Sequence, residues 1–323
     1  MKIFVLLLLS LSLLYGSNNQ LNVGVLAYGT VNWELMTIKS LGLDKKYGFD
    51  LEIKELASKD GVAVAFQADS VDVIVNDWIW VNRQNYPNFS LYFYPYSTGT
   101  GGIYTNNPHY RTLGDLKGKK LGVAGGAMDK SWLLYKAYAR QKLGIDLSSY
   151  AEIVFAAPPI LNAKLSDGSL DAVLNFWHYN VLLDEKGMTS ISSVREVLDS
   201  FGISNQDIPF TGWVFKRSFA AENKNMINGF LQASEEANKI LKHDDTAWNT
   251  LRPHMHVKDD AAFEALKKGY REGIPDKFTQ EEIKGIEKIY TILEKTAGKS
   301  LVGDSKQFDK TMFWPYKPNT VRK

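Results

Sequence analysis

Short apolar strands alternate with helical segments along the first third of the chain, and this alternation restricts its fold more than any other feature. Strands are predicted at 21–27, 49–56, 71–76 and 91–97, with helical segments at 31–43, 60–69 and 78–84. Strands joined through helices favour parallel pairing with right-handed crossovers, because the helix must carry the chain back across the sheet. This part of the chain therefore predicts an α/β unit.

The same alternation starts again near residue 113. A short helix and a strand are predicted within 113–126, further strands at 151–156, 170–176 and 189–194, and helices at 129–144, 159–167 and 177–187. Residues 209–217 are predicted to be a strand that returns to the first unit, and residues 218 to about 295 to be mostly helix. A chain of 323 residues suits two domains better than one. The fold class is therefore α/β, with two doubly wound lobes.

The composition excludes several classes of function. The formal net charge is only +2 and the charges are mixed along the chain, so we expect no nucleic-acid partner. The chain has no cysteine, which excludes thiolate nucleophiles, cysteine-ligated zinc, iron–sulfur clusters and a lipid anchor on an N-terminal cysteine. His254 and His256 are two residues apart with no third ligand nearby, so no metal site and no cofactor are expected.

The N-terminus has the layout of a cleavable signal peptide. Lys2 precedes twelve mostly apolar residues at 3–14, and the small polar stretch 16–19 follows. Twelve residues are too few to span a bilayer comfortably, so a signal peptide at 1–17 is favoured over a membrane anchor. The cleavage point stays open because Leu14 and Tyr15 suit it poorly. Export to the periplasm is expected.

Several stretches, taken with the order of the elements, resemble one known family. They are Gly24–Asn32, Lys45–Asp50, Gln67–Asn76, Leu113–Gly122 (LGDLKGKKLG), Gly168–Asn175 and Asn223–Gln232. In these, the chain resembles the periplasmic substrate-binding proteins of ABC importers, in the NitT/TauT group that serves sulfonates, nitrate, taurine and thiamine-precursor pyrimidines. The resemblance covers about residues 20–290.

The resemblance implies two lobes joined by two crossover strands, near 97–104 and 208–213, with the ligand in the cleft between the lobes. Lobe I would comprise 18–104 and 209–323, and lobe II 105–208. It further implies a monomer that catalyses no reaction, binds a small organic solute and delivers it to an ABC permease and its ATPase subunit.

Candidate binding residues follow the strands, because ligands of open parallel sheets bind beyond the carboxyl ends of the strands. They are Tyr28, Thr30, Asn32, Trp33, Asn76, Asp77, Trp78, Gly126, Met128, Asp129, Lys130, Ser131, Asn175, Phe176, Trp177, His178, Thr211 and Trp213. Six of the eight tryptophans fall at these strand ends or on the second crossover. They predict aromatic pocket walls for a planar ring or a cationic head, the alternative being ordinary core packing.

Three of these positions have two interpretations each. Residues 125–131 precede a helix and suit either an anion clamp or a glycine turn in which Asp129 caps the helix. Asp77 suits a ligand amine or an N-cap, and His178 suits a pocket hydrogen bond or a helix surface.

Two other functions stay open. An enzyme on the same fold, similar to the futalosine-pathway dehydratases and cyclases, is disfavoured by the signal-like N-terminus. A sensory module that binds a solute without transporting it has no distinguishing sequence feature.

Overall fold

The computed structural model describes residues 19–85, 89–205, 207–297 and 307–315. The predicted signal peptide at 1–17 lies outside the described residues. Among the described residues, no helix has both the length and the apolarity to cross a bilayer.

The first sheet has the strand order β2-β1-β3-β10-β4. Its strands are β1 (Gln20–Leu26), β2 (Asp50–Leu56), β3 (Val73–Asn76), β4 (Leu91–Ser97) and β10 (Thr211–Lys216). β1 pairs in parallel with β2 and β3, whereas β10 runs antiparallel to both β3 and β4. The sheet is therefore mixed, and the strand predicted to return from the second unit lies inside it.

The second sheet has the strand order β7-β6-β8-β5-β9. Its strands are β5 (Gly102–Thr105), β6 (Lys120–Val123), β7 (Glu152–Phe155), β8 (Ala172–Asn175) and β9 (Thr189–Ser193). β6 pairs in parallel with β7 and β8, and β5 runs antiparallel to β8 and β9. Each sheet thus combines three parallel strands with an antiparallel pair at one side.

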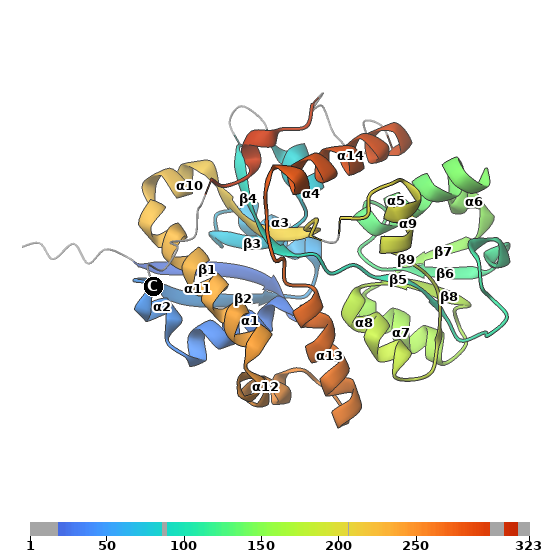
Figure 1. The fold of residues 1–323 in the computed structure, drawn as a ribbon, viewed down its shortest axis with the longest axis horizontal. Helices are drawn as coiled ribbons and strands as arrows, with labels where there is room; N and C mark the ends of the chain where they lie inside the picture. Colours follow the sequence, from blue (N-terminus) through green and yellow to red (C-terminus); the bar gives the residue numbers. More distant parts are fainter. Residues whose placement is uncertain (1–18, 86–88, 206, 298–306, 316–323) are drawn as a thin grey trace, which may run out of the picture.

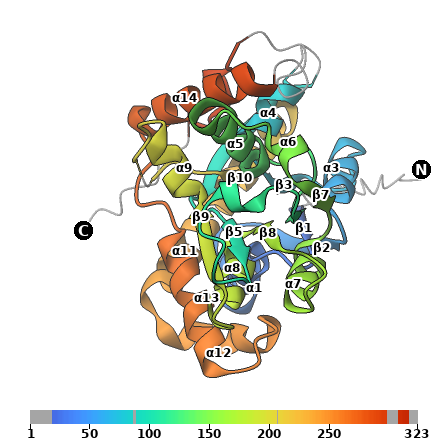
Figure 2. The same cartoon turned by 90° about the vertical axis from the view of Figure 1, so that its right-hand side faces the viewer.

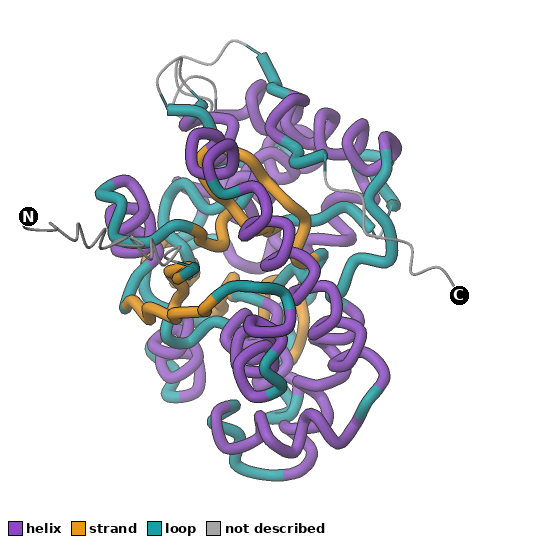
Figure 3. The backbone as a smooth tube through the Cα atoms, turned by 90° about the vertical axis from the view of Figure 1, so that its left-hand side faces the viewer, coloured by secondary structure: helices purple, strands orange, loops and turns teal. Residues whose placement is uncertain are grey.

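Helices cover both faces of each sheet (Figures 1, 2 and 3). Lobe I, the first sheet with its helices, contains α1 (Val31–Ser40), α2 (Leu43–Lys46), α3 (Lys59–Gln67), α4 (Trp78–Gln84), α10 (Arg217–Glu222), α11 (Lys224–His243), α12 (Asp245–Leu251), α13 (Asp260–Glu272) and α14 (Gln280–Ala297). Lobe II, the second sheet with its helices, contains α5 (Lys130–Tyr138), α6 (Leu147–Tyr150), α7 (Pro158–Ser166), α8 (Trp177–Asp184) and α9 (Val194–Ser200). The predicted α/β fold with two doubly wound lobes is confirmed.

The chain crosses between the sheets at 98–101 and again at 201–210. The strands predicted from the residue pattern appear within two residues of their expected ends, but the pattern did not predict β5, which overlaps the crossover strand that the resemblance implied near 97–104. Gly99, Gly101 and Gly102 around its start are typical of a loop. The domain boundary predicted after Tyr104 falls inside β5, which belongs wholly to the second sheet.

The two lobes also touch outside the crossovers. Helix α13 packs against α8, and α14 packs against α5. One apolar cluster contains Ile286 and Leu293 of α14 together with Trp132 and Leu133 of α5. A second cluster, built mainly from α1, α11, α12 and α13, fills the other face of the first sheet. These contacts on either side of the crossovers position the carboxyl ends of β1, β3, β6 and β8 opposite one another.

Candidate functional site: a pocket between the lobes

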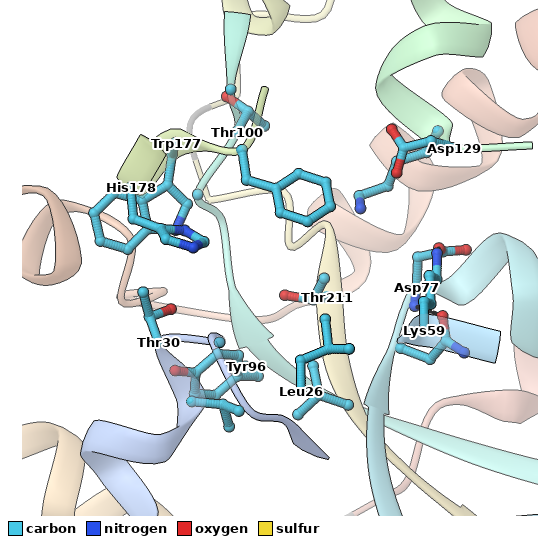
Figure 4. A pocket seen from close by; sticks show the side chains of 18 of the residues that line it. Leu26, Thr30, Lys59, Asp77, Tyr96, Thr100, Asp129, Trp177, His178 and Thr211 are labelled. Atoms are coloured by element: carbon cyan, nitrogen blue, oxygen red, sulfur yellow. Dashed lines mark hydrogen bonds and ion pairs between the residues drawn. The ribbon is translucent and has the colours of Figure 1, made fainter. Parts of the chain in front are cut away.

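A cavity of about 160 Å³ lies between the lobes and is the candidate site. Lobe I and the crossovers contribute Val25, Leu26, Gly29, Thr30, Val31, Lys59, Val62, Val75, Asn76, Asp77, Tyr96, Gly99, Thr100, Gly101 and Thr211, and lobe II contributes Asp129, Lys130, Ser131, Phe176, Trp177 and His178. We call it the front pocket. Figure 4 shows Trp177, His178 and Thr30 at one end, and Lys59, Asp77 and Asp129 at the other.

Ten of the predicted residues line the front pocket. They are Thr30, Asn76, Asp77, Asp129, Lys130, Ser131, Phe176, Trp177, His178 and Thr211. Asn76 is the last residue of the parallel strand β3, Thr211 is the first residue of β10, and the other eight follow a parallel strand. The structure brings these residues to one cavity; that they contact a ligand stays a prediction.

The predicted wall of tryptophans is wrong for most of its members. Trp78 and Trp213 are fully buried in lobe I, where their indole N–H groups donate to Pro209 O and Ser234 Oγ. Trp33 is buried against Trp248 and Tyr270. A residue just past a strand can point toward the core as readily as toward the cleft, and a sequence position alone does not give that direction. Trp132 is buried in lobe II, and Trp80 lines a smaller neighbouring hollow. Of the six predicted rings, only Trp177 lines the front pocket.

The other predicted residues lie near the pocket without lining it. Tyr28 and Gly126 do not contribute to the lining. The amides of Asn32 and Asn175 donate to the backbone at Leu26 and Pro158, so both support turns beneath the pocket. Met128 is exposed and lines a smaller neighbouring hollow.

The charged end of the pocket is built around an ion pair in lobe I between the half-buried Lys59 and the buried Asp77. Lys59 Nζ lies 2.8 Å from Asp77 Oδ2, and Asp77 Oδ1 accepts the backbone N–H of Trp80 as the N-cap of α4. Burial by itself raises the pKa of Asp77, but the ammonium groups of Lys59 and Lys130 outweigh it and lower that pKa to about 2. Asp77 is therefore both N-cap and pocket residue.

Lobe II contributes a second aspartate and a second lysine to this end, Asp129 and Lys130. Asp129 caps α5 by accepting the backbone N–H of Ser131, at 2.9 Å. Gly125, at φ +79°, leaves room for this carboxylate, since a Cβ there would lie 2.5 Å from Asp129 Oδ2. The glycine-turn interpretation of 125–131 thus fits the structure, because the carboxylate of Asp129 occupies the helix end where an external anion would bind.

The charges of the two lobes are complementary across the pocket. Burial works to lower the pKa of Lys59, but the carboxylates of Asp77 and of Asp129 from the opposite lobe raise it. Lys130 acts in the same cross-lobe manner on Asp77. Two lysines and two aspartates line the cavity, so this end is formally neutral.

The aromatic end is dominated by Trp177, which extends from lobe II against lobe I. Its ring lies 6.5 Å from that of Trp33, edge to face. A Cβ on Gly99 would lie 2.8 Å from Trp177, and one on Gly269 of α13 would lie 2.7 Å from it. Two glycines thus make room for the indole where the lobes meet.

His178 has unused hydrogen-bonding capacity at the same end. Both of its ring nitrogens are buried, and neither has a hydrogen-bond partner within the described part of the chain. Burial lowers the pKa of His178 to about 4, and the nearby backbone of Tyr28, which does not meet hydrogen-bond geometry, offsets this only in part. The ring is therefore neutral at neutral pH, with one donor nitrogen and one acceptor nitrogen. Helices α1 and α8 both begin at this end without a side-chain cap.

A buried polar network supports the wall of the pocket from behind. Glu34 is completely buried, and burial raises its pKa to about 8 despite hydrogen bonds from Ser234, Asn238 and Tyr270. The Tyr270 hydroxyl lies 3.4 Å from that of Tyr96, which lines the pocket. Glu34 is thus held in its neutral form.

Several lining residues were not predicted from the sequence. Lys59 follows β2, so the strand-end rule would have found it had it been applied to that strand. Tyr96 lies inside an antiparallel strand, and Gly99–Gly101 lie on the crossover, where no periodic signal marks them.

Solved structures of similar fold include proteins with different functions. The alkanesulfonate-binding protein SsuA from Xanthomonas axonopodis pv. citri, bound to MOPS, is 14% identical, covers 92% of this chain and 98% of its own, and gives a TM-score of 0.69. The periplasmic nitrate-binding protein NrtA from Synechocystis PCC 6803 is 16% identical, covers 78% of this chain and 70% of its own, and gives a TM-score of 0.59. The desulfurization enzyme DSZB is 14% identical, covers 86% of this chain and 92% of its own, and gives a TM-score of 0.58.

No protein-family model and no curated protein sequence matches the chain. The structural likeness, at these low identities, establishes the fold: this chain has the two-lobed α/β fold of the type II periplasmic binding proteins.

Proposed function

We propose that this protein is an extracytoplasmic solute-binding protein that captures a small organic solute in the front pocket and delivers it to an ABC importer. The observation that carries this proposal is the position of the pocket. It lies at the carboxyl ends of parallel strands from both sheets, and its walls come from both lobes, the first crossover and the start of β10.

Capture proceeds by closure of the lobes around the solute. A solute that contacts Trp177 and His178 on lobe II together with Thr30 and Tyr96 on lobe I holds the two lobes together. Such contacts exist at the same time only in the closed conformation, so binding shifts the population toward it.

The lining favours a small, uncharged ring with polar edges. Val25, Leu26, Val75 and Phe176 give apolar walls, and the two lysines and two aspartates at the charged end already neutralise one another. His178 and the uncapped starts of α1 and α8 offer hydrogen bonds to a carbonyl or a ring nitrogen. A substituted pyrimidine or another small heteroaromatic solute fits this chemistry better than a simple anion. The binding of a sulfonate would depend on the starts of α1 and α8 alone.

The remaining parts of the proposal concern location and partners. The predicted signal peptide at 1–17 would direct the chain to the periplasm, where a monomer would dock on a permease coupled to an ATPase subunit. Lobe I would comprise the first sheet with the C-terminal helices and lobe II the second sheet.

One experiment tests the proposal against its alternatives. The protein is purified without added ligand, the small molecules released on denaturation are identified by mass spectrometry, and their binding is measured by calorimetry. We expect one solute per chain, released chemically unchanged, and binding about 100-fold weaker after Trp177→Ala.

Chemical conversion of the solute by the purified protein would instead support an enzyme, as in the similar fold of DSZB. Uptake of the solute by vesicles that contain the permease and ATPase would separate transport from sensing, because a sensory module would leave uptake unchanged.

A further inference from the structure

A second cavity lies between the lobes, and its volume of about 330 Å³ is twice that of the front pocket. It is lined by the crossover 98–102, by α8, by the strand β9 with its following residues, and by the end of α13. We call it the rear cavity. Like the front pocket, it is built from both lobes.

The first crossover separates the two cavities. Gly99, Thr100, Gly101 and Trp177 line both, while the remaining lining residues differ. A segment that contributes to two cavities with otherwise separate walls lies between them. The front pocket and the rear cavity are therefore on opposite sides of the crossover and share Trp177 as a common wall.

One residue that lines the rear cavity has a buried donor with no acceptor within the described part of the chain. Asn180 on α8 is only 5% exposed. Its Oδ1 accepts the backbone N–H of Gly102 at 2.8 Å, which fixes the orientation of the amide, and its Nδ2 has no partner among the described residues. Because buried polar groups are nearly always hydrogen-bonded, such an unsatisfied donor indicates an acceptor that comes from outside the chain.

The charges at the cavity favour a cation. Asp184 of α8, whose Oδ2 accepts from the Tyr104 hydroxyl at 2.8 Å, and Glu272 of α13, whose Oε1 lies 3.9 Å from Lys268 Nζ, place one exposed carboxylate on each lobe. Among the described lining residues Arg195 is the one with a positive charge, and its guanidinium donates to the carbonyl oxygens of Thr98 and Asn205. A bound cation between the two carboxylates would contact both lobes at once.

We propose that the rear cavity is a second solute site, for a small amine that also carries a hydrogen-bond acceptor, such as an amino alcohol. Its ammonium group pairs with Asp184 and Glu272, and its oxygen accepts from Asn180 Nδ2. This site is independent of the identity of the solute in the front pocket.

Occupancy of the rear cavity is coupled to the front pocket. Both cavities exist in the same arrangement of the lobes, so a molecule that fills the rear cavity stabilises the arrangement that also encloses the front pocket. By linkage the coupling is positive and acts equally in both directions.

The test uses ethanolamine as the probe and the side-chain NMR signals of Asn180 and Trp177 as reporters, with Trp177 assigned from Trp177→Phe. We expect saturable shifts of both signals, and no saturable shifts with ethylene glycol or acetate. The double variant Asp184→Asn/Glu272→Gln should weaken ethanolamine binding by about tenfold or more, since both carboxylates lose their charge.

The control is Glu185→Gln/Glu222→Gln, which removes the same charge from two exposed residues outside the cavity. It should leave the ethanolamine affinity nearly unchanged. Absence of saturable shifts in the wild-type protein, or equal weakening in the two double variants, would overturn the proposal.

The coupling is measured by small-angle scattering, where ethanolamine should make the ligand-free protein more compact; expansion would refute positive coupling. None of these experiments uses the solute that binds in the front pocket. If ethanolamine does not bind, the proposal of solute capture in the front pocket is unaffected. If solute capture is disproved, the proposed rear site is likewise unaffected.

Discussion

The two ends of the front pocket differ in how far the protein satisfies its own polar groups. At the charged end, Asp77 bonds to Lys59 and to the start of α4, and Asp129 bonds to the start of α5. At the aromatic end, both nitrogens of His178 are buried without a partner among the residues that the structure describes, and α1 and α8 start without a side-chain cap.

We infer from this difference that the two ends of the front pocket have different roles. Groups that already satisfy one another gain little from a ligand, whereas an unsatisfied buried group gains a full hydrogen bond. The charged end therefore contributes mainly to holding the lobes together, and the aromatic end to recognising the solute. Substitutions at the two ends should separate affinity from closure.

The largest effect is expected from Trp177→Ala. The substitution removes the ring that lines the pocket and touches both the crossover and α13, so solute affinity should fall by about 100-fold, from lost apolar contact. Calorimetry with the solute recovered from the protein measures the change.

Trp78→Phe is the contrasting variant, because Trp78 is buried in lobe I and does not line the pocket. It should lower the free energy of unfolding and leave the affinity nearly unchanged. A large loss of affinity in Trp78→Phe, with little loss in Trp177→Ala, would reverse the assignment of these rings.

Much of the fold was predictable because the alternation of strands and helices is a local signal. Apolar stretches such as 71–76 and 170–176 mark buried strands by their composition alone. Strand β5 was missed because its pairing with β8 and β9 is decided by distant residues. Gly102 lies so close to Ser192 O that a Cβ there would be 2.6 Å from it, a constraint invisible in the local sequence.

The site was predictable in its location but not in its side-chain directions. The strand-end rule placed Asp77, Asp129 and His178 at one cavity. It failed for Trp78 because the first residue of α4 faces the core, where its indole reaches Pro209 O across 131 residues of sequence. Such tertiary contacts decide whether a strand-end residue faces the core or the cleft.

The next prediction concerns stability at low pH, to which His178 at the aromatic end and Asp77 at the charged end should contribute differently. The pKa of His178 is about 4 in the folded protein against 6.5 for the ordinary group, so the unfolded chain binds more protons between these values. The stability contributed by neutral His178 is therefore complete above pH 6.5 and is lost as the pH falls toward 4, by about 2 kcal/mol after allowance for partial solvation. Asp77, with a pKa of about 2, stays ionised throughout this window.

Urea unfolding of the wild type and of His178→Gln at pH 7 and pH 4.5 measures this effect. The variant should lose less stability than the wild type on acidification, whereas His243→Gln, at a helix end outside the front pocket, should behave like the wild type. Identical pH dependence of the unfolding free energy in all three proteins would show that His178 does not become protonated between pH 7 and pH 4.5.

A smaller effect is expected from Gly269→Ala on α13. The added Cβ would lie 2.7 Å from the Trp177 ring, so the indole must shift and solute affinity should fall by about tenfold. Gly114→Ala is the matched control, because a Cβ there meets only Thr112 Oγ1, at 3.4 Å. Unchanged affinity in Gly269→Ala would mean that the position of the Trp177 ring matters less than its presence.

The smallest effect is expected at the charged end, from Lys130→Met. Its charge acts on Asp77 across the lobes but forms no ion pair within 4 Å among the described residues, so affinity should fall only about threefold. The loss should shrink further at high salt, because screening weakens the same attraction in the wild type. Lys164→Met removes an equal charge from the exposed surface of lobe II and should change neither the affinity nor its salt dependence. A loss in Lys130→Met as large as that in Trp177→Ala would move solute recognition to the charged end and break the division between the two ends.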